Sequence, residues 1–236
     1  MRFSSVCIVC GKEAQKITKS DVPLFRCPGC GLLWLWDDTI AGDFYDDLSI
    51  DTGAGITARR LRDCRNRVKT FERYGPLDHL CDVGTNDGTF LRTLKDEGYE
   101  HCFGIEPNRR GVEAAVAAGV DVVRGSVDQL VRLCGDRDVR TVSFLQVLEH
   151  LRDPAAALDQ ARQVLPAGGC LIIETVNADA SMVCVQGAYI SQYHRFYFTE
   201  KNLRLLLQKH GFRLFGWYRV IVGAVLLALV LTGYLK

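Results

Sequence analysis

The sequence predicts an α/β fold, in which a parallel sheet with helices on both faces follows a small cysteine-rich module. Three observations predict it: apolar and amphipathic segments alternate between residues 76 and 175, a glycine turn follows the first apolar segment, and two cysteine pairs lie near the start. The length of 236 residues and the hydrophobic content of 48% suit one full domain with a small attachment and exclude wholesale disorder. The formal net charge of +1 disfavours a strongly basic nucleic-acid binder.

The cysteine-rich module spans residues 1–36 and contains two C-x2-C pairs, formed by Cys7, Cys10, Cys27 and Cys30. Two residues between thiolates let one tight turn present both sulfurs to one ion, and a glycine after each pair permits the left-handed backbone of such a turn. Four thiolates favour zinc over hard cations, whereas a redox pair would begin a helix after a strand, a setting that neither pair has. We therefore predict a structural zinc ribbon whose metal supplies much of its folding free energy.

The surface of this ribbon has two interpretations. Its basic residues are Lys12, Lys16, Lys19 and Arg26, and two tryptophans, Trp34 and Trp36, follow them. Basic and aromatic residues together would suit phosphates and stacked bases. Alternatively, the basic face is merely solvated and the tryptophans pack on the next domain, an interpretation that we favour because the charge is thin.

Residues 37–75 predict a linker followed by a helix. Residues 37–56 are rich in aspartate and are interrupted by glycines. From about Thr57 to Tyr74 the chain is basic and helical, and Leu61, Val68 and Phe71 lie near one face. A Gly-Pro pair then ends the helix.

Residues 76–218 predict the main domain, built from alternating strands and helices. His79–Val83 predicts a short buried strand, Gly84–Gly88 a turn, and Thr89–Glu97 an amphipathic helix. The later strands are expected at 102–105, 120–123, 139–145 and 170–174, and the helices between them at 109–118, 127–134 and 154–165. In a parallel sheet of this kind, ligands bind at the carboxyl ends of the strands, near the switch in strand order.

The glycine turn indicates which ligand the sheet binds. A dinucleotide fingerprint would read G-x-G-x-x-G, but the chain reads D-x-G-x-x-x-G from Asp82 to Gly88. Asp82 and Asp87 disfavour a pyrophosphate at this turn and suit a ligand with an ammonium group. Glu106 ends the second strand, where a carboxylate can accept hydrogen bonds from both ribose hydroxyls. A nucleoside that carries an amino acid fits both features, and S-adenosylmethionine is that molecule.

Four segments resemble class I S-adenosylmethionine-dependent methyltransferases: Cys81–Gly88, Gly104–Pro107, Val147–Pro154 and Leu165–Gly169. The third is similar to the branch that contains ubiquinone-pathway O-methyltransferases and many small-molecule and sugar methyltransferases. The cysteine pairs resemble the zinc-ribbon subset of that branch, which includes deoxysugar C-methyltransferases, and Tyr193–Thr199 with the segment up to Phe212 resembles its late strand and helix. The resemblance implies a Rossmann-like methyltransferase sheet.

The resemblance also implies which residues bind the cofactor. These are Asp82, Gly84, Thr85, Asp87 and Gly88 in the turn, Glu106 at the ribose, Ser126 and Val127 near the adenine, and Gln146 and Val147 under the methionine and the sulfonium. Ser126 stands where many relatives carry an acidic residue that contacts the adenine amino group. This departure weakens that contact or moves it to Asp128.

The same resemblance implies in-line methyl transfer, which a general base assists when the acceptor is a hydroxyl or an acidic C–H. The candidate catalytic residues are Glu149, His150, Tyr193 and His194. We expect His194 to be the base, although Glu149 and His150 could instead cap the next helix and His194 could satisfy core hydrogen bonds. The deoxysugar C-methyltransferase pattern has Y-H-E-H near this point, and the chain keeps one histidine and lacks the glutamate.

We predict an enzyme that methylates a small metabolite or glycan-type acceptor. One alternative is a zinc-ribbon RNA methyltransferase, but Leu145–Leu148 replaces the N/D-P-P-Y/F segment of many nucleic-acid amino-group methyltransferases. A second alternative is a non-catalytic module that binds the cofactor or docks to a partner. Nothing in the sequence predicts an oligomeric state.

The carboxyl-terminal segment, residues 219–236, has two interpretations. Val220–Leu235 is 16 residues without a charge, and a membrane span needs about 20. It forms either a buried terminal strand or helix, or a membrane-associated helix that would suit a lipid-linked substrate. Ten cysteines without a secretory signal indicate a reducing compartment, so we expect a cytoplasmic protein, with membrane association as the alternative.

Overall fold

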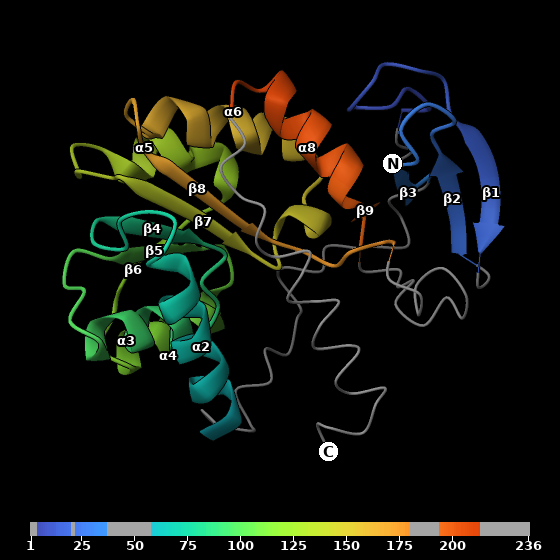
Figure 1. The fold of residues 1–236 in the computed structure, drawn as a ribbon. Coiled ribbons are helices and arrows are strands. Elements are labelled where there is room, and N and C mark those ends of the chain that lie inside the picture. The colour runs from blue at the N-terminus through green and yellow to red at the C-terminus, as the bar shows by residue number, and fades with distance from the viewer. Residues whose placement is uncertain (1–3, 20–21, 37–57, 180–193, 213–236) are drawn as a thin grey trace. The chain divides into compact units, whose positions relative to one another are not determined.

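The computed structural model describes residues 4–19, 22–36, 58–179 and 194–212, drawn in colour in Figure 1. The predicted linker up to residue 57, Tyr193 and the carboxyl-terminal segment 219–236 lie outside the described residues. The chain divides into two compact units. One comprises Met1–Gly42, Glu149–Ala155 and Glu174–Lys236, and the other comprises Asp43–Leu148 and Ala156–Ile173.

The second unit is built on the predicted sheet. Its strands are β4 (Leu80–Val83), β5 (Phe103–Glu106), β6 (Asp121–Arg124), β7 (Thr141–Leu145) and β8 (Cys170–Glu174), in the order β6-β5-β4-β7-β8. The pairings of β4 with β5, β4 with β7 and β5 with β6 are parallel, which confirms the predicted α/β class. The strand order reverses between β4 and β7, so a ligand is expected beside the carboxyl end of β4.

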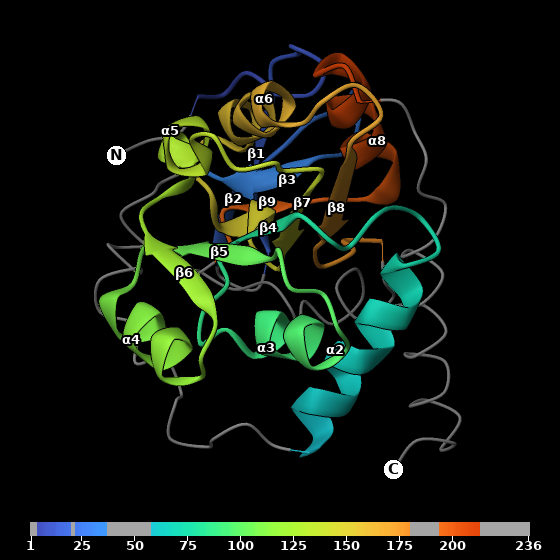
Figure 2. The same ribbon diagram turned by 90° about the vertical axis from the view of Figure 1, so that its left-hand side faces the viewer.

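Helices cover both faces of this sheet. The helices are α2 (Ala58–Phe71), α3 (Thr89–Asp96), α4 (Arg109–Ala117), α5 (Leu130–Cys134) and α6 (Pro154–Val164). Figures 1 and 2 show α2, α3 and α4 on one face, and α5 and α6 on the other. The predicted helix at 127–134 is divided into a 3-10 turn, η2 (Val127–Gln129), and the short α5.

The helix that precedes the sheet, α2, packs one face into the core of the second unit. Cys64, Val68 and Phe71 of α2 are buried at helical spacing and join a cluster that includes residues of α3 and β4. The rings of Phe71 and Phe90 meet edge to face with centroids 6.0 Å apart. Leu61, which the pattern placed on this face, is only half-buried.

The first unit contains an antiparallel sheet with strand order β1-β2-β3-β9. Its strands are β1 (Gln15–Lys19), β2 (Val22–Arg26), β3 (Leu33–Leu35) and β9 (Phe196–Tyr197). The pairing of β9 with β3 joins the late part of the chain to the ribbon, a long-range contact that no local pattern predicted. Thr199 then caps α8 (Glu200–Lys209), since its side chain accepts a hydrogen bond from the Asn202 N–H.

Among the described residues, no helix combines the length and the apolar character that crossing a bilayer requires.

Candidate functional site

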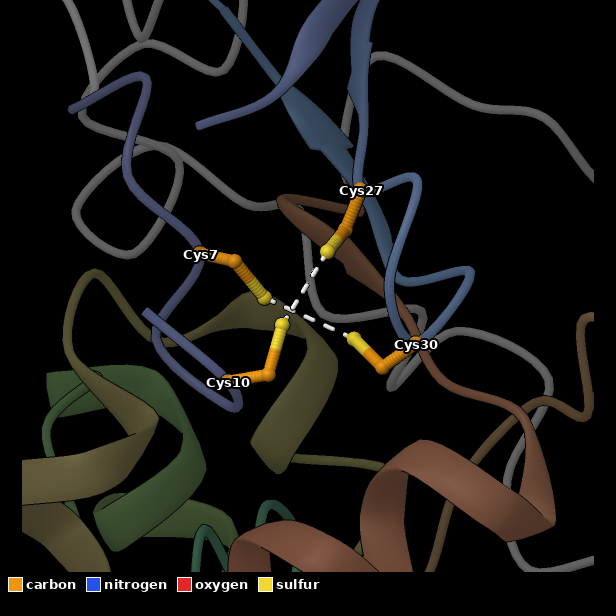
Figure 3. A group of neighbouring side chains, drawn as sticks. All are labelled: Cys7, Cys10, Cys27 and Cys30. Atoms are coloured by element: carbon orange, nitrogen blue, oxygen red, sulfur yellow. Dashed lines mark hydrogen bonds between the residues drawn. The ribbon is translucent and has the colours of Figure 1, made fainter. Parts of the chain in front are cut away.

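The four cysteines of the first unit form a cluster that could hold one zinc ion (Figure 3). The sulfurs of Cys7 and Cys30 lie 3.5 Å apart, and those of Cys10 and Cys27 lie 3.3 Å apart. Four sulfur ligands around one ion at about 2.3 Å lie at comparable separations, so the donor set fits tetrahedral zinc. Burial acts to raise the pKa of Cys27, but hydrogen bonds from the Cys30 backbone and the Cys10 thiol lower it to about 6. We call these residues the four-cysteine cluster.

The two tryptophans of the ribbon lie in different environments. Trp34 is buried, and its ring lies 5.5 Å from that of Phe25. The Lys16 ammonium stands 4.6 Å from the centre of the Trp36 ring. One tryptophan is therefore unavailable for base stacking, and the other already has a cationic neighbour from the protein.

In the second unit, the glycine turn brings the ends of β4 and β7 together. Gly84 has φ 75°, and a Cβ atom there would lie 2.5 Å from Val147 Cγ2. Only glycine permits both this backbone conformation and this approach. Two expected cofactor residues that are distant in sequence thus meet at the switch point of the sheet.

Asp82 lies at the carboxyl end of β4, and its side chain is buried. The Ser143 hydroxyl donates a 2.6 Å hydrogen bond to its carboxylate. Burial raises the pKa of Asp82 to about 6, against the effect of that hydrogen bond. A cationic ammonium group placed here would stabilise the ionised form.

Glu106 ends β5, and backbone groups hold both of its oxygens. Oε2 accepts a hydrogen bond from the Asn86 N–H and Oε1 accepts one from the Asn108 N–H, each 2.8 Å long. Burial raises the pKa of Glu106, while these two hydrogen bonds lower it in part. Because each carboxylate oxygen has two lone pairs, one acceptor position per oxygen remains for a pair of hydroxyls.

Asp87 has protein partners of its own. The Arg60 guanidinium donates two hydrogen bonds to it, at 2.8 and 3.1 Å, and Thr89 donates from both its N–H and its hydroxyl. Burial acts to raise the pKa of Asp87, but these groups lower it overall. Asp87 thus ties α2 to the turn, and no local pattern predicted its pairing with Arg60.

The remaining expected cofactor residues occupy varied environments. Thr85 is buried in the turn, Val127 is half-buried in η2, and Gln146 is exposed with φ 59°. Ser126 donates a short hydrogen bond to the carboxylate of Asp128. Ser126 and Asp128, the acidic residue that could contact the adenine amino group instead, therefore lie side by side.

Three of the four expected catalytic residues come together in the first unit. Glu149, His150 and His194 each offer one ligand or proton-transfer atom, and these atoms lie within 4.8 Å of one another. The His150 and His194 rings are 4.8 Å apart and edge to face. Tyr193 lies outside the described residues. We call the three residues the glutamate–histidine cluster.

The environments of Glu149 and His194 differ from what the sequence suggested. Burial raises the pKa of Glu149 to about 7, and burial together with the nearby His150 lowers the pKa of His194 to about 4. The Thr175 hydroxyl acts to lower the pKa of Glu149, but no hydrogen bond of ordinary geometry reaches either Glu149 oxygen or His194 Nδ1 among the described residues. The Glu149 side chain therefore caps no helix there, and His194 Nδ1 satisfies no core hydrogen bond.

A twisted parallel sheet with helices on both faces, a glycine turn at the switch point and buried carboxylates ending two adjacent strands define the class I methyltransferase fold. A profile of the methyltransferase domain family matches residues 54–215. The chain belongs to this family of methyltransferase domains.

Solved structures agree with this fold at low sequence identity. A SAM-dependent methyltransferase from Archaeoglobus fulgidus is 21% identical with a TM-score of 0.56, covering 65% of this chain and 69% of the other. Magnesium protoporphyrin IX methyltransferase from Synechocystis PCC 6803, solved with bound S-adenosylhomocysteine, is 19% identical with a TM-score of 0.55, covering 75% and 90%.

Curated relatives match part of the chain. A tRNA U34 carboxymethyltransferase from Vibrio cholerae is 30% identical over 145 residues, which are 56% of this chain and 44% of the relative. An uncharacterised 37.1 kDa protein in a transposon of Streptomyces fradiae is 29% identical over 133 residues, which are 54% of this chain and 37% of the relative. The chain thus spans less than half the length of these relatives.

Proposed function

We propose that the chain transfers the methyl group of S-adenosylmethionine to a small metabolite or glycan-type acceptor. The observation that carries the cofactor assignment is Glu106, whose two oxygens are fixed by backbone N–H groups and keep one acceptor position each. This geometry suits the two hydroxyls of a ribose. The formal net charge of +1 gives no general attraction for a polyanionic acceptor.

The protein's part in the reaction is to hold the cofactor and to activate the acceptor. Bound S-adenosylmethionine supplies a methyl group that its sulfonium already activates for in-line displacement. Asp82 is placed to meet the amino group of the cofactor, and Gly84 allows the turn to close on Val147. The protein then needs only to align the methyl group with an acceptor atom and to help remove the acceptor proton.

We assign acceptor activation to the glutamate–histidine cluster as a whole. The sequence favoured His194 as the base, but an imidazole with a pKa of about 4 attracts a proton weakly at neutral pH. Glu149, with a pKa of about 7, is closer to the range in which proton transfer is efficient. The ligand or proton-transfer atoms of the three side chains lie within 4.8 Å of one another, so they can act on one acceptor group.

Binding of S-adenosylmethionine and of S-adenosylhomocysteine, measured by calorimetry, tests the cofactor assignment. We expect Glu106→Ala to weaken binding about 10- to 100-fold, because hydrogen bonds to a charged group contribute about 1.5–3 kcal/mol. Glu113→Ala, on the exposed face of α4, is the matched control and should leave binding unchanged. Undetectable binding by the unmodified chain would contradict the proposal.

Transfer of labelled methyl groups into fractionated cell extracts tests the acceptor. Label is expected in the small-molecule or glycan fraction and absent from the reaction with Glu106→Ala. Label confined to nucleic acid or protein would contradict the acceptor class while leaving the cofactor assignment intact.

RNA modification is the second candidate function, because curated relatives about 30% identical to this chain are tRNA modifiers by name. Labelled methyl transfer into purified tRNA would support it, provided that binding weakens steeply with salt as phosphate contacts require. The burial of Trp34 and the thin positive charge of the ribbon weigh against it.

A further inference from the structure

Two side chains of the glutamate–histidine cluster have unmet bonding requirements. Glu149 is 1% exposed, and although the Thr175 hydroxyl is near enough to lower its pKa, no hydrogen bond of ordinary geometry reaches either of its oxygens among the described residues. His194 Nδ1 is also buried and without a partner there. Buried polar groups are nearly always satisfied, and an unpaired buried carboxylate is especially costly. These atoms therefore point to a missing ligand.

Backbone contacts fix the two segments of the cluster beside each other. The Arg195 N–H donates to the Glu149 carbonyl at 2.8 Å, and the Arg195 guanidinium donates to the His150 carbonyl at 2.6 Å. The Leu35 N–H of β3 in turn donates to the Arg195 carbonyl at 2.9 Å. The ribbon sheet thus holds the backbone segments that carry the cluster. Contacts other than those among the three side chains therefore keep these segments together.

The donor set of the cluster favours a cation. Glu149 supplies a buried carboxyl group, and His150 and His194 supply two imidazoles whose ring centroids lie 4.8 Å apart. A neutral imidazole and a carboxylate are the protonation states that ligate metal ions.

We propose that Glu149, His150 and His194 bind a divalent transition-metal ion through one carboxylate and two imidazoles. Their ligand atoms lie within 4.8 Å of one another, and two nitrogen or oxygen ligands of a tetrahedral zinc ion lie about 3.4 Å apart, so side-chain rotations that bring them closer by up to about 1.4 Å suffice. This donor set suits Zn²⁺ or Fe²⁺ rather than Ca²⁺, which takes oxygen ligands only.

Three protein ligands leave coordination positions open. An oxygen atom of the acceptor could occupy an open position, and the metal ion would then lower the pKa of that hydroxyl group. Use of the metal to activate the acceptor rests on the function proposed above, but binding of the metal does not. If the metal is bound, Glu149 serves as a ligand and not as a free base.

A second group of metal-binding side chains in the structure provides the contrast. Asp78, His79 and His101 also lie within ligand distance of one another. However, these side chains are partly or largely exposed, and the two histidines already pair with aspartate carboxylates at 3.5–3.8 Å. This group has no unpartnered buried atom in the described chain and carries no proposal, but it offers a matched histidine control.

The experiment is a titration of the zinc-loaded chain with Co²⁺, with bound cobalt measured by equilibrium dialysis and elemental analysis. We expect one further equivalent of metal, with a visible spectrum that lacks thiolate-to-cobalt charge transfer because the ligands are nitrogen and oxygen. His150→Gln, His194→Gln and Glu149→Gln should each weaken this binding about 100-fold or more, and His101→Gln should leave it unchanged.

Folding of each variant is checked by the zinc content of the four-cysteine cluster and by cooperative thermal unfolding. Glu149→Gln is the most informative variant, because it replaces a buried carboxyl by a neutral group of the same shape. Co²⁺ should raise the Tm of the unmodified chain and not that of folded Glu149→Gln. A spectrum with thiolate charge transfer alone, no second equivalent, or loss of that equivalent in His101→Gln would overturn the proposal.

Discussion

Asp82 and Glu106 are two carboxylates at the ends of adjacent strands, but the protein compensates their negative charges to different extents. Glu106 receives two backbone N–H groups, so its charge is compensated by the protein before any ligand binds. Asp82 accepts a hydrogen bond from the Ser143 hydroxyl, but burial is the larger effect and raises its pKa to about 6. Asp82 therefore depends on a ligand's positive charge to be fully ionised, and Glu106 depends on it less.

Affinity for S-adenosylmethionine should fall as the pH falls through about 6. The pKa of Asp82 is raised in the folded chain, so its carboxylate becomes protonated there, well above the range of an exposed aspartate. Below this pH the affinity contributed by Asp82 should decrease by up to about tenfold per pH unit. Calorimetry across this range on the unmodified chain and on Asp82→Asn measures it. The variant should bind more weakly and lack this pH dependence. An affinity of the unmodified chain that does not change with pH would contradict the prediction.

Gly84→Ala should destabilise the chain by about 2–4 kcal/mol, since it combines positive φ with overpacking against Val147. Gly119→Ala is the matched control, because Gly119 has the same φ of 75° but nothing within 4 Å of an added Cβ. It should cost only about 1 kcal/mol. Urea unfolding measures both.

The clash itself can be isolated by adding Val147→Ala. That change removes the atom nearest to the new methyl group, so Gly84→Ala should cost less in this background than alone. Strict additivity of the two substitutions would show that the methyl group does not meet Val147.

At this scale, the sequence identified Asp82, Gly84 and Glu106 because they stand at fixed offsets from an apolar strand. It could not identify Arg60 as the partner of Asp87, nor the unpartnered state of Glu149. These properties arise from tertiary contacts between distant segments, which local spacing does not encode.

At the scale of elements, the pair Arg60–Asp87 attaches α2 to the glycine turn. A double-mutant cycle of Arg60→Ala and Asp87→Ala should give a coupling of about 1 kcal/mol, because the pair is bidentate but Arg60 is partly exposed. The control cycle of Arg59→Ala and Asp63→Ala joins a 4.0 Å exposed pair and should give a coupling near zero. Equal couplings in the two cycles, measured by urea unfolding, would argue against this attachment.

The strands and helices of the second unit agree with the sequence prediction to within a few residues, because each has a strong apolar period and a glycine or proline boundary. β8, Cys170–Glu174, matches its predicted range. The exception in the first unit is β9: its two residues lie in a segment expected to be a strand, but its partner β3 is in the ribbon. Strand pairing over such sequence distance follows from packing and not from pattern.

At the scale of the whole molecule, removal of zinc should affect the two units unequally. The ribbon sheet has only a small hydrophobic cluster, formed by Leu24, Leu35, Ala178 and Tyr197, so the four-cysteine cluster should supply much of its stability. The second unit has a larger core of its own around α2, α3 and β4. Chelation, or Cys27→Ser, should abolish hydrogen-exchange protection in β1, β2, β3 and β9. Protection in β4 and β5, together with calorimetric binding of S-adenosylmethionine, should persist. Loss of protection throughout the chain would show that the units unfold together.

The pairing of β3 with β9 also sets an order of events during synthesis. The four cysteines emerge from the ribosome long before Phe196 and Tyr197, so zinc can be loaded before these two residues are made. The open edge of β3, however, waits for Phe196 and Tyr197. Until then the nascent ribbon presents an unpaired strand edge, the kind of surface that recruits chaperones or pairs with a neighbouring chain. The ribbon can therefore begin to fold long before its sheet can be completed.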